Sequence, residues 1–299
     1  MNAPEPSDAA FTALLAELRP RLHRYCARMV GSALDGEDLV QDTLAKAVRR
    51  YDPSEVRHAQ AWLFRIAHNT ALDFLRQRKL EHGLFAEPEG GDFADAPAGD
   101  PQAAHDSVGS ALATFMRLPP QQRSAVVLAD VLEHSLAETA EAMETTVPAV
   151  KAALHRGRAR LRALATLQAD AHGALTASER ERVTLYAALF NARDFDALRA
   201  MLADDVRLDL AGRHRVDGKA RVANYFSHYA DFPDVRAVPA NVEGRPGLVM
   251  HVGGDMRPSY AVVLEWRGPS LVRIRDFRYA TYVMETLTVD PSSRARPGP

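Results

Sequence analysis

The 299-residue sequence has one cysteine and no long apolar run. A single cysteine, Cys26, excludes a disulfide framework and a cysteine-based metal cluster, and it favours a reducing compartment. A membrane-spanning helix needs roughly 18 consecutive apolar residues, which this sequence lacks. The first ten residues are polar and acidic, without the basic and apolar segments of a secretory signal. We therefore expect a cytoplasmic protein that does not contact a membrane.

An excess of positive charge is also missing, since 37 basic residues stand against 39 acidic ones and the formal net charge is −2. A protein that binds nucleic acid over its whole surface is strongly basic, so any DNA contact here must come from local surfaces. Apolar residues make up 46% of the chain. A chain of this length and composition fills the cores of roughly two or three domains.

Charge and composition divide the chain into segments. Residues 81–110 carry seven acidic side chains and no lysine or arginine, together with several glycines and prolines. This composition predicts a flexible acidic linker. The predicted order is a helical domain (1–80), the linker (81–110), a second helical domain (111–168), a connector (169–177), a third domain (178–287) and a disordered tail (288–299).

Three helices are predicted in the first domain. An apolar stripe with helical spacing is closed by Gly31. Asp35 is expected to cap the second helix, which Pro53 closes. The third helix is expected to run from about residue 58 to residue 80.

The second domain has the pattern of a helix-turn-helix. Ser135 and Glu138 match the Ser-x-x-Glu capping box, which predicts a short helix ending near Met143. A tight turn over residues 144–146 follows, and a long helix begins at Val147. A short helix, a tight turn and a long helix are typical of DNA-binding domains.

The long helix carries a basic face. Lysine, histidine and arginine side chains follow one another at intervals of four, three and four residues, which places them on one side of a helix. Such a helix fits the major groove, where lysine and arginine reach guanine edges and phosphates. A solvated basic face is the alternative, and the preceding helix and turn favour DNA binding. The expected contacts are Thr146, Lys151, His155, Arg156, Arg158 and Arg162.

A polar stripe also follows the third helix of the first domain, opposite its apolar face. Aromatic residues beside basic ones can hold single-stranded DNA by stacking and phosphate contact. The alternative is that Trp62, Phe64 and Phe74 are core residues and the stripe is solvated. The candidate DNA contacts are Arg65, Asn69, Asp73, Arg76, Arg78 and Lys79.

Acidic residues crowd the start of the second helix. Acids at this position favour the helix dipole, which accounts for them without any function. Asp38, Gln41 and Asp42, however, lie three and four residues apart on the outer face. They are a candidate protein-docking surface.

The third domain places helices first and strands after, without regular alternation. This order predicts an α+β fold with an antiparallel sheet. Helices are expected over 180–191, 195–202 and 219–229, and strands over 206–210, 235–242, 248–252, 260–266 and 271–279.

Three stretches of the helical domains carry a family resemblance. They are GEDLVQDTLAKAVRRYD, AWLFRIAHNTALDFLRQRK and LPPQQRSAVVLADVLEHSLAETAEAMETTVPAVKAALHRGRARL. Their order and spacing resemble the two domains of bacterial sigma factors of the extracytoplasmic-function class, over about residues 8–165. The resemblance implies that residues 38–42 dock on the clamp helices of core RNA polymerase, with a further contact to its flap. It also implies that the third helix reads the −10 promoter element and the helix-turn-helix reads the −35 element. Glu144 stands where the family usually has a turn glycine.

The third domain resembles the SnoaL-like branch of the cone-shaped NTF2-like fold, through ERVTLYAALFNARDFDALRAMLADDVRLDL and LVRIRDFRYATYV. The resemblance implies a curved sheet around a pocket. The candidate pocket residues are Asp209, His214, Tyr225, Tyr260, Arg275 and Asp276. Asp209 and Asp276 each interrupt an apolar strand, and a carboxylate in an apolar cone can act as a general base. The alternative is that these residues face water. The Trp-Leu-Pro-Glu-Pro motif that precedes the domain in some such sigma factors is absent.

The sequence therefore predicts a multidomain sigma factor that binds core RNA polymerase and promoter DNA. We expect two all-α sigma domains, a cone-shaped SnoaL-like α+β domain that regulates them in cis, and no cofactor, metal or catalytic residue. Two alternatives stay open. The third domain could be an isomerase or hydrolase acting on a small-molecule ligand, or the chain could be a one-component regulator that uses only its helix-turn-helix.

Overall fold

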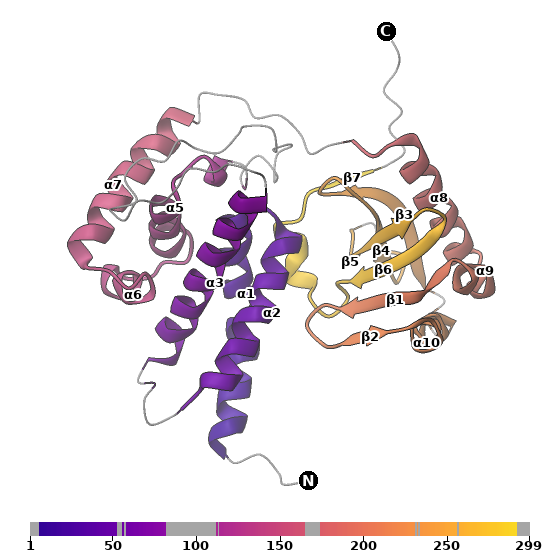
Figure 1. The fold of residues 1–299 in the computed structure, drawn as a ribbon, viewed down its shortest axis with the longest axis horizontal. Coiled ribbons are helices and arrows are strands. Elements are labelled where there is room, and N and C mark those ends of the chain that lie inside the picture. Colours follow the sequence, from indigo (N-terminus) through magenta and orange to yellow (C-terminus); the bar gives the residue numbers. More distant parts are fainter. Residues whose placement is uncertain are drawn as a thin grey trace. The chain divides into compact units, whose positions relative to one another are not determined.

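The computed structural model describes residues 6–52, 56, 58–81, 112, 114–164, 174–230, 232, 234–255 and 257–291. The chain divides into two compact units, Met1–Ala171 and His172–Pro299 (Figure 1). No helix in the described part of the chain is long and apolar enough to cross a membrane. Residues 82–110 of the predicted linker, 169–173 of the connector, 292–299 of the tail and Pro53 lie outside the described residues.

The first helical domain consists of α1 (Pro6–Val30), α2 (Ala33–Arg50) and α3 (Ala59–Glu81). Gly31 ends α1 with a φ of +78°, as expected for a glycine after the last helical turn. The predicted cap of α2 was wrong. Ser32 has the extended backbone of an N-cap, and its hydroxyl accepts a hydrogen bond from the Asp35 amide at 3.1 Å. Asp35 itself lies in the first helical turn, where its charge favours the dipole.

A glycine lets the first two helices approach closely. A Cβ added to Gly36 would lie 2.7 Å from the backbone nitrogen and Cα of Ala27 in α1. Real Cβ atoms do not come this close to another backbone, so only glycine fits here without a shift of one helix. The core next to this contact contains Leu22, Tyr25 and Met29, all fully buried.

The second helical domain contains α5 (Pro120–Val126), the π-helical turn η1 (Val127–Val131), α6 (Leu136–Ala142) and α7 (Val147–Leu164). The capping box is confirmed, because the Ser135 hydroxyl and the Glu138 carboxylate each accept from the other residue's backbone amide. The start of the long helix at Val147 is also confirmed.

The two helical domains share one core and one buried hydrogen-bond network. The Tyr25 hydroxyl of α1 lies 2.9 Å from His68 Nδ1 of α3 and 2.9 Å from Ser124 Oγ of α5. His68 and Ser124 are also 3.1 Å apart. Arg123 of α5 adds hydrogen bonds to the Met29 carbonyl at the end of α1 and to the Leu118 carbonyl. The first unit is therefore held together by polar contacts between sequence-distant helices.

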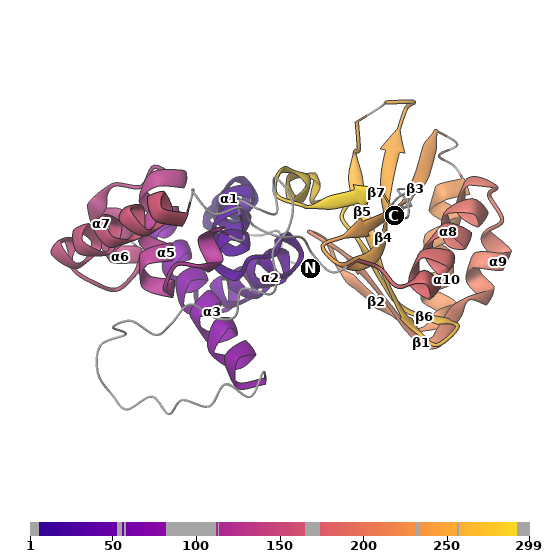
Figure 2. The ribbon, with the colours of Figure 1, turned by 90° about the horizontal axis from the view of Figure 1, so that it is seen from above.

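The second unit is an α+β domain. Its helices are α8 (Ala177–Asn191), α9 (Phe195–Ala200) and α10 (Lys219–Ala230), followed by the 3₁₀ turn η2 (Thr281–Glu285). Its strands are β1 (Leu202–Leu210), β2 (Arg215–Asp217), β3 (Val235–Val242), β4 (Arg245–Val252), β5 (Tyr260–Arg267), β6 (Ser270–Asp276) and β7 (Val289–Pro291). They form one sheet in the order β2-β1-β6-β5-β4-β3-β7. The helices α8, α9 and α10 lie on one face of this sheet (Figure 2).

The sheet differs from the prediction in three ways. The neighbours β1 and β6 are parallel, whereas the other pairs are antiparallel as expected. The short strand β2 was not predicted. The tail was expected from residue 288, but β7 pairs with β3, with Val242 opposite Val289, so the ordered domain extends further than the apolar pattern indicated.

The contact at Gly36 gives a stability prediction. We expect Gly36→Ala to lower the free energy of unfolding of the first unit by about 2 kcal/mol, because the added methyl group forces α1 and α2 apart. Chemical denaturation followed by circular dichroism measures this change. Gly268→Ala is the control for adding a methyl group, because nothing lies within 4 Å of a Cβ there, although its φ of +58° adds local strain. An unchanged unfolding midpoint in Gly36→Ala would contradict the packing described here.

Candidate nucleic-acid and polymerase interface

The helix α7 buries one side and exposes a basic one. Val150, Ala153, Leu154 and Gly157 are buried against the second helical domain. The side chains predicted to contact the −35 element are all exposed on α7 or at its start, namely Thr146, Lys151, His155, Arg156, Arg158 and Arg162. Thr146 caps the helix, since its hydroxyl accepts from the Ala149 amide at 3.3 Å. The exposed face thus gathers five basic or histidine side chains and the capping threonine on one helix and at its start.

One arginine of this face is held by a carboxylate of its own domain. Arg158 donates two hydrogen bonds to Asp130 of η1, from Nε at 2.9 Å and from a terminal nitrogen at 2.6 Å. Asp130 also raises the pKa of Arg158. The pair is half exposed and fixes the guanidinium on the exposed side of the helix.

The turn before α7 keeps its geometry without a glycine. Glu144 has a φ of +50°, in the left-handed region where glycine is favoured. The Thr145 amide donates to the Ala140 carbonyl and the Glu144 amide to the Glu141 carbonyl, the pattern of a Schellman motif. A residue with a Cβ costs roughly 1 kcal/mol more than glycine at this position.

The polar stripe of α3 is solvent-accessible along its length. Asn69, Asp73, Arg76, Arg78 and Lys79 are exposed, and Arg65 is half-buried. Two of its cations pair with carboxylates. Arg76 bonds Asp73 one turn earlier at 2.9 Å, and Arg78 lies 3.8 Å from Asp35 of α2.

The aromatic residues beside the stripe divide into buried and partly buried ones. Phe64 is fully buried, with its ring 4.6 Å from that of His134 and edge-on to it. Trp62 is partly buried beside Phe11 and Tyr51, and Phe74 is partly buried in the same core. Phe64 is therefore a core residue, as the alternative interpretation proposed, whereas Trp62 keeps some exposed surface.

The polar stripe and the turn before α7 meet. Asn69 Nδ2 donates a 2.9 Å hydrogen bond to Glu144 Oε2, although the two residues are 75 positions apart. This contact joins a predicted −10 contact to the helix-turn-helix. No sequence pattern indicated it.

The acidic face of α2 lies where it was predicted. Asp42 is exposed, and Asp38 and Gln41 are half-exposed on the same side of the helix. Gln41 donates a long hydrogen bond of 3.5 Å to Glu37. Val48, one to two turns further along this side, is 64% exposed, so the acidic face continues into an apolar position.

The second unit contains a buried carboxylate with four hydrogen bonds. Oδ2 of Asp276 accepts from the Tyr225 hydroxyl at 2.8 Å, the Tyr229 hydroxyl at 3.0 Å and Arg278 Nε at 3.0 Å. Its Oδ1 accepts from the Arg278 amide at 2.8 Å. Tyr260 joins through the Tyr229 hydroxyl at 3.0 Å. Burial, and then the Asp276 charge, raise the pKa of both Tyr225 and Tyr229.

The predicted pocket residues separate onto two faces of the sheet. Tyr225, Tyr260 and Asp276 come together on the helix-covered face. Asp209 and Arg275 are register neighbours on the opposite face, because the inward positions of β1 and β6 are Leu208 and Ile274. Asp209 is paired there with Arg215 and Arg273, each at 2.6 Å. His214 is exposed in the turn before β2.

Ion pairs with two arginines determine the direction in which the pKa of Asp209 is shifted. Burial raises its pKa, but hydrogen bonds from Arg215 and Arg273 outweigh burial, so the pKa lies below its ordinary value. Asp209 is therefore an ion-paired, largely buried carboxylate. It does not line a space that it shares with Asp276.

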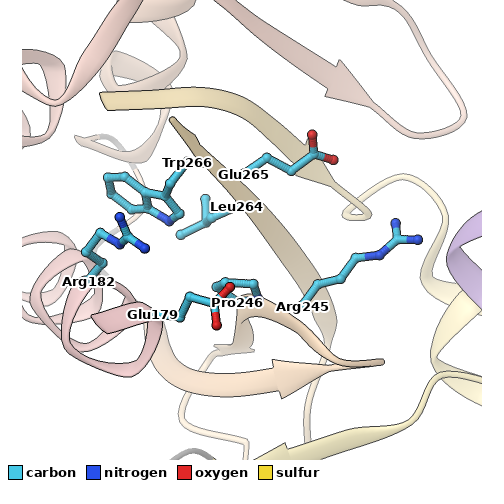
Figure 3. A pocket seen from close by; sticks show the side chains of 7 residues that line it. All are labelled: Glu179, Arg182, Arg245, Pro246, Leu264, Glu265 and Trp266. Carbon is cyan, nitrogen blue, oxygen red and sulfur yellow. The ribbon is translucent and has the colours of Figure 1, made fainter. Parts of the chain in front are cut away.

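A cavity of about 330 Å³ opens between the start of α8 and the strands β4 and β5 (Figure 3). Its lining residues are Glu179, Arg182, Arg245, Pro246, Leu264, Glu265 and Trp266. The Arg182 guanidinium lies next to the Trp266 indole, with its central carbon 5.8 Å from the ring centroid. Trp266 Nε1 and Arg182 Nε are both buried and have no hydrogen-bond partner. The sequence analysis predicted none of these residues.

Within the described residues, no group of three or more histidine, cysteine or acidic side chains is arranged to hold a metal ion.

Three family models match the chain in sequence order. The model described as Sigma-70 region 2 matches residues 14–81, and that described as Sigma-70, region 4 matches residues 110–161. A model described as SnoaL-like domain matches residues 183–282. The first range covers most of α1 and all of α2 and α3, and the second covers α5, α6 and most of α7. The third runs from within α8 to the start of η2, and β7 lies beyond it.

Curated relatives share the helical domains. The chain is 35% identical over 223 residues to the ECF RNA polymerase sigma factor SigG of Mycobacterium tuberculosis, across 65% of this chain and 60% of that protein. The RNA polymerase sigma-E factor of Streptomyces coelicolor is 36% identical over 163 residues, across 54% of this chain and 89% of that protein. Among solved structures, the extracytoplasmic function sigma factor SigJ of Mycobacterium tuberculosis aligns over 89% of this chain and 95% of its own, with 23% identity and a TM-score of 0.35.

The buried histidine of the first unit gives a pH prediction. Burial lowers the pKa of His68 from 6.5 to about 4, while Glu144 raises it and Arg76 lowers it by smaller amounts. Between pH 4 and pH 6.5 the His68 imidazole is therefore protonated in the unfolded chain and neutral in the folded chain. The free energy of unfolding is therefore highest above pH 6.5, where His68 is neutral in both states. It decreases as the pH falls towards 4, by up to about 3 kcal/mol.

Urea titrations between pH 7 and pH 4 measure this dependence. We expect His68→Gln to flatten the fall in unfolding free energy across this window. His155→Gln, at an exposed histidine of α7, should leave it unchanged. Equal slopes in wild type and His68→Gln would show that His68 is not the titrating group.

Proposed function

Because the chain belongs to the family of extracytoplasmic-function RNA polymerase sigma factors, we propose that it binds core RNA polymerase and directs it to specific promoters. The acidic face of α2 docks on the polymerase clamp helices. The polar stripe of α3 captures and opens the −10 element, and the basic face of α7 reads the −35 element in the major groove. The second helical domain also contacts the polymerase flap.

One observation carries this proposal most directly. Three exposed surfaces of different chemistry lie on three helices of one unit, and each falls within a matching sigma region. A one-component regulator needs the basic helix but neither the acidic face nor the single-strand stripe. The net charge of −2 also fits a protein that reaches DNA through a larger partner.

We also propose that the second unit regulates the first without performing catalysis. A general base needs a lone pair directed at its substrate. Asp276 is fully buried and its two oxygens accept four hydrogen bonds from the protein itself, so this carboxylate is a structural anion. Asp209 is held by two arginines. The two candidates for a general base, Asp209 and Asp276, thus both already accept hydrogen bonds from side chains of the protein.

Covalent linkage makes regulation in cis effective. Twelve residues separate the end of α7 from the start of α8. A chain of this length spans at most roughly 40 Å. The effective concentration of the second unit near the helix-turn-helix is therefore on the order of millimolar.

The regulatory ligand we propose is a small aromatic carboxylate bound in the cavity beside Trp266. The volume of about 330 Å³ is sufficient for a single aromatic ring with a short substituent. The Trp266 indole, Leu264 and Pro246 offer apolar surface to the ring. Arg182 and Arg245 line the cavity, and a carboxylate pairs with a guanidinium through charge-assisted hydrogen bonds. Glu179 is occupied by the cap of α8, through Thr176.

The polymerase-docking proposal is tested by charge reversal. We expect Asp38→Lys with Asp42→Lys to weaken binding of core RNA polymerase by about tenfold or more, because the substitution places like charge against the partner's surface. A titration of fluorescent full-length protein with core polymerase measures this. Reversal of two other exposed acids, Glu17 and Asp204, is the matched control.

Promoter reading is tested in the same system. Run-off transcription on genomic DNA, with sequencing of start sites, should lose promoter-specific starts in Lys151→Ala while core binding stays intact. A chain ending at Ala171 tests regulation in cis, and we expect its start sites or their strengths to differ from those of the full chain. An identical start-site profile would remove the regulatory role of the second unit.

The ligand proposal is tested through tryptophan fluorescence. The chain has two tryptophans, so Trp62→Phe leaves Trp266 as the reporter. We expect benzoate to quench this signal saturably, and the neutral isostere benzamide to bind at least tenfold more weakly for lack of a charge-assisted hydrogen bond. Arg182→Gln should abolish the difference between the two probes. Equal affinity for both probes in the unmodified cavity would contradict a carboxylate site.

A further inference from the structure

The helix-turn-helix has an acidic residue where its backbone favours glycine. Glu144 ends α6 in the left-handed region, with a φ of +50°, and completes a Schellman motif whose end position is usually glycine. A side chain in this conformation costs free energy that the surrounding structure must offset. Glu133, Arg193 and Glu243 share this backbone region, so a role for Glu144 follows from the contact that its side chain makes and not from its backbone.

The Glu144 carboxylate engages the other helical domain. Its Oε2 accepts from Asn69 Nδ2 at 2.9 Å, and both side chains are exposed at the rim of the contact between α3 and α6. Behind this rim the interface is buried. His68 contacts Tyr25 and Ser124 there, and Phe64 packs edge-on against His134. The hydrogen bond is thus accessible to solvent and competitors, while the interface beneath it is not.

This arrangement cannot be the promoter-bound one. The −10 and −35 elements that the proposed function assigns to α3 and α7 lie about 25 base pairs apart, roughly 80 Å along the duplex at 3.4 Å per base pair. Asn69 instead lies within hydrogen-bond distance of the turn that begins α7. The two helical domains must separate before both elements are read, and the Asn69–Glu144 contact must break when they do.

We propose that Glu144 is an autoinhibitory residue, whose carboxylate acts as an internal competitor for the −10 strand. Its carboxylate occupies the Asn69 amide in the closed arrangement, as a base edge or phosphate would in the open one. It also repels a nucleic-acid backbone that approaches while the domains are closed. This inference rests on the proposed function, because it takes from it the assignment of Asn69 to the −10 element.

A partner that binds only when the two helical domains are separated has a reduced apparent affinity. This apparent affinity is the intrinsic affinity multiplied by the fraction of molecules in the open form. Removing the carboxylate therefore increases affinity for core polymerase. We expect Glu144→Ala, which keeps the strained backbone, and Glu144→Gly, which relieves it, both to bind core polymerase about threefold to tenfold more tightly than wild type, the range of one solvent-exposed hydrogen bond. Glu141→Ala, at an exposed glutamate of α6, should match wild type.

A double-mutant cycle tests the contact without polymerase. Asn69→Ala, Glu144→Ala and the double variant are compared in urea unfolding of the full chain, where a coupling of about threefold to tenfold in the unfolding equilibrium constant is expected. Additive effects in this cycle overturn the proposal, as does wild-type affinity for core polymerase in both Glu144 variants. Failure of the wild-type chain to bind core polymerase counts against the proposed function, and the cycle then decides whether the contact exists.

Discussion

The first unit depends on one buried hydrogen-bond set, in which Tyr25, His68 and Ser124 from α1, α3 and α5 satisfy one another. Each of these polar groups would be costly to bury alone, since an unpaired hydroxyl or imidazole loses its water without replacement. Together they fix the side of α3 that faces the second helical domain. Arg123, buried against the end of α1, supports the same junction by donating to the Met29 carbonyl. Two helical domains separated by a long acidic segment therefore pack as one body.

The second unit also contains a buried polar cluster whose members supply one another's hydrogen bonds. Asp276 is a fully buried anion, and it is tolerated because Tyr225, Tyr229 and Arg278 supply its hydrogen bonds. The network fastens α10 to β6. Buried donors without a hydrogen-bond partner occur both in this network, at Arg278 Nη2, and beside the cavity, at Trp266 Nε1 and Arg182 Nε.

The features that could be predicted from the sequence are local. The capping box at Ser135, the start of α7 and its basic face follow from spacings of three and four residues, and the structure has them. The contacts that could not be predicted join distant segments, such as Asn69 to Glu144 across 75 positions. The placement of Asp209 is an intermediate case. Val206, Leu208 and Leu210 alternate along the predicted strand, and strict alternation places Asp209 on the face opposite this apolar set.

The two edges of the sheet affect the tendency of the protein to aggregate through strand addition. Each edge is a strand of three residues, β2 at one side and β7 at the other. β7 covers Ala240–Val242 of β3, and the Asn191 side chain pairs with the Ala237 backbone further along the same edge. The rest of the eight-residue strand β3 has no strand neighbour on that side among the described residues. Loss of β7 would lengthen this open edge, and an open strand edge favours intermolecular strand addition and aggregation.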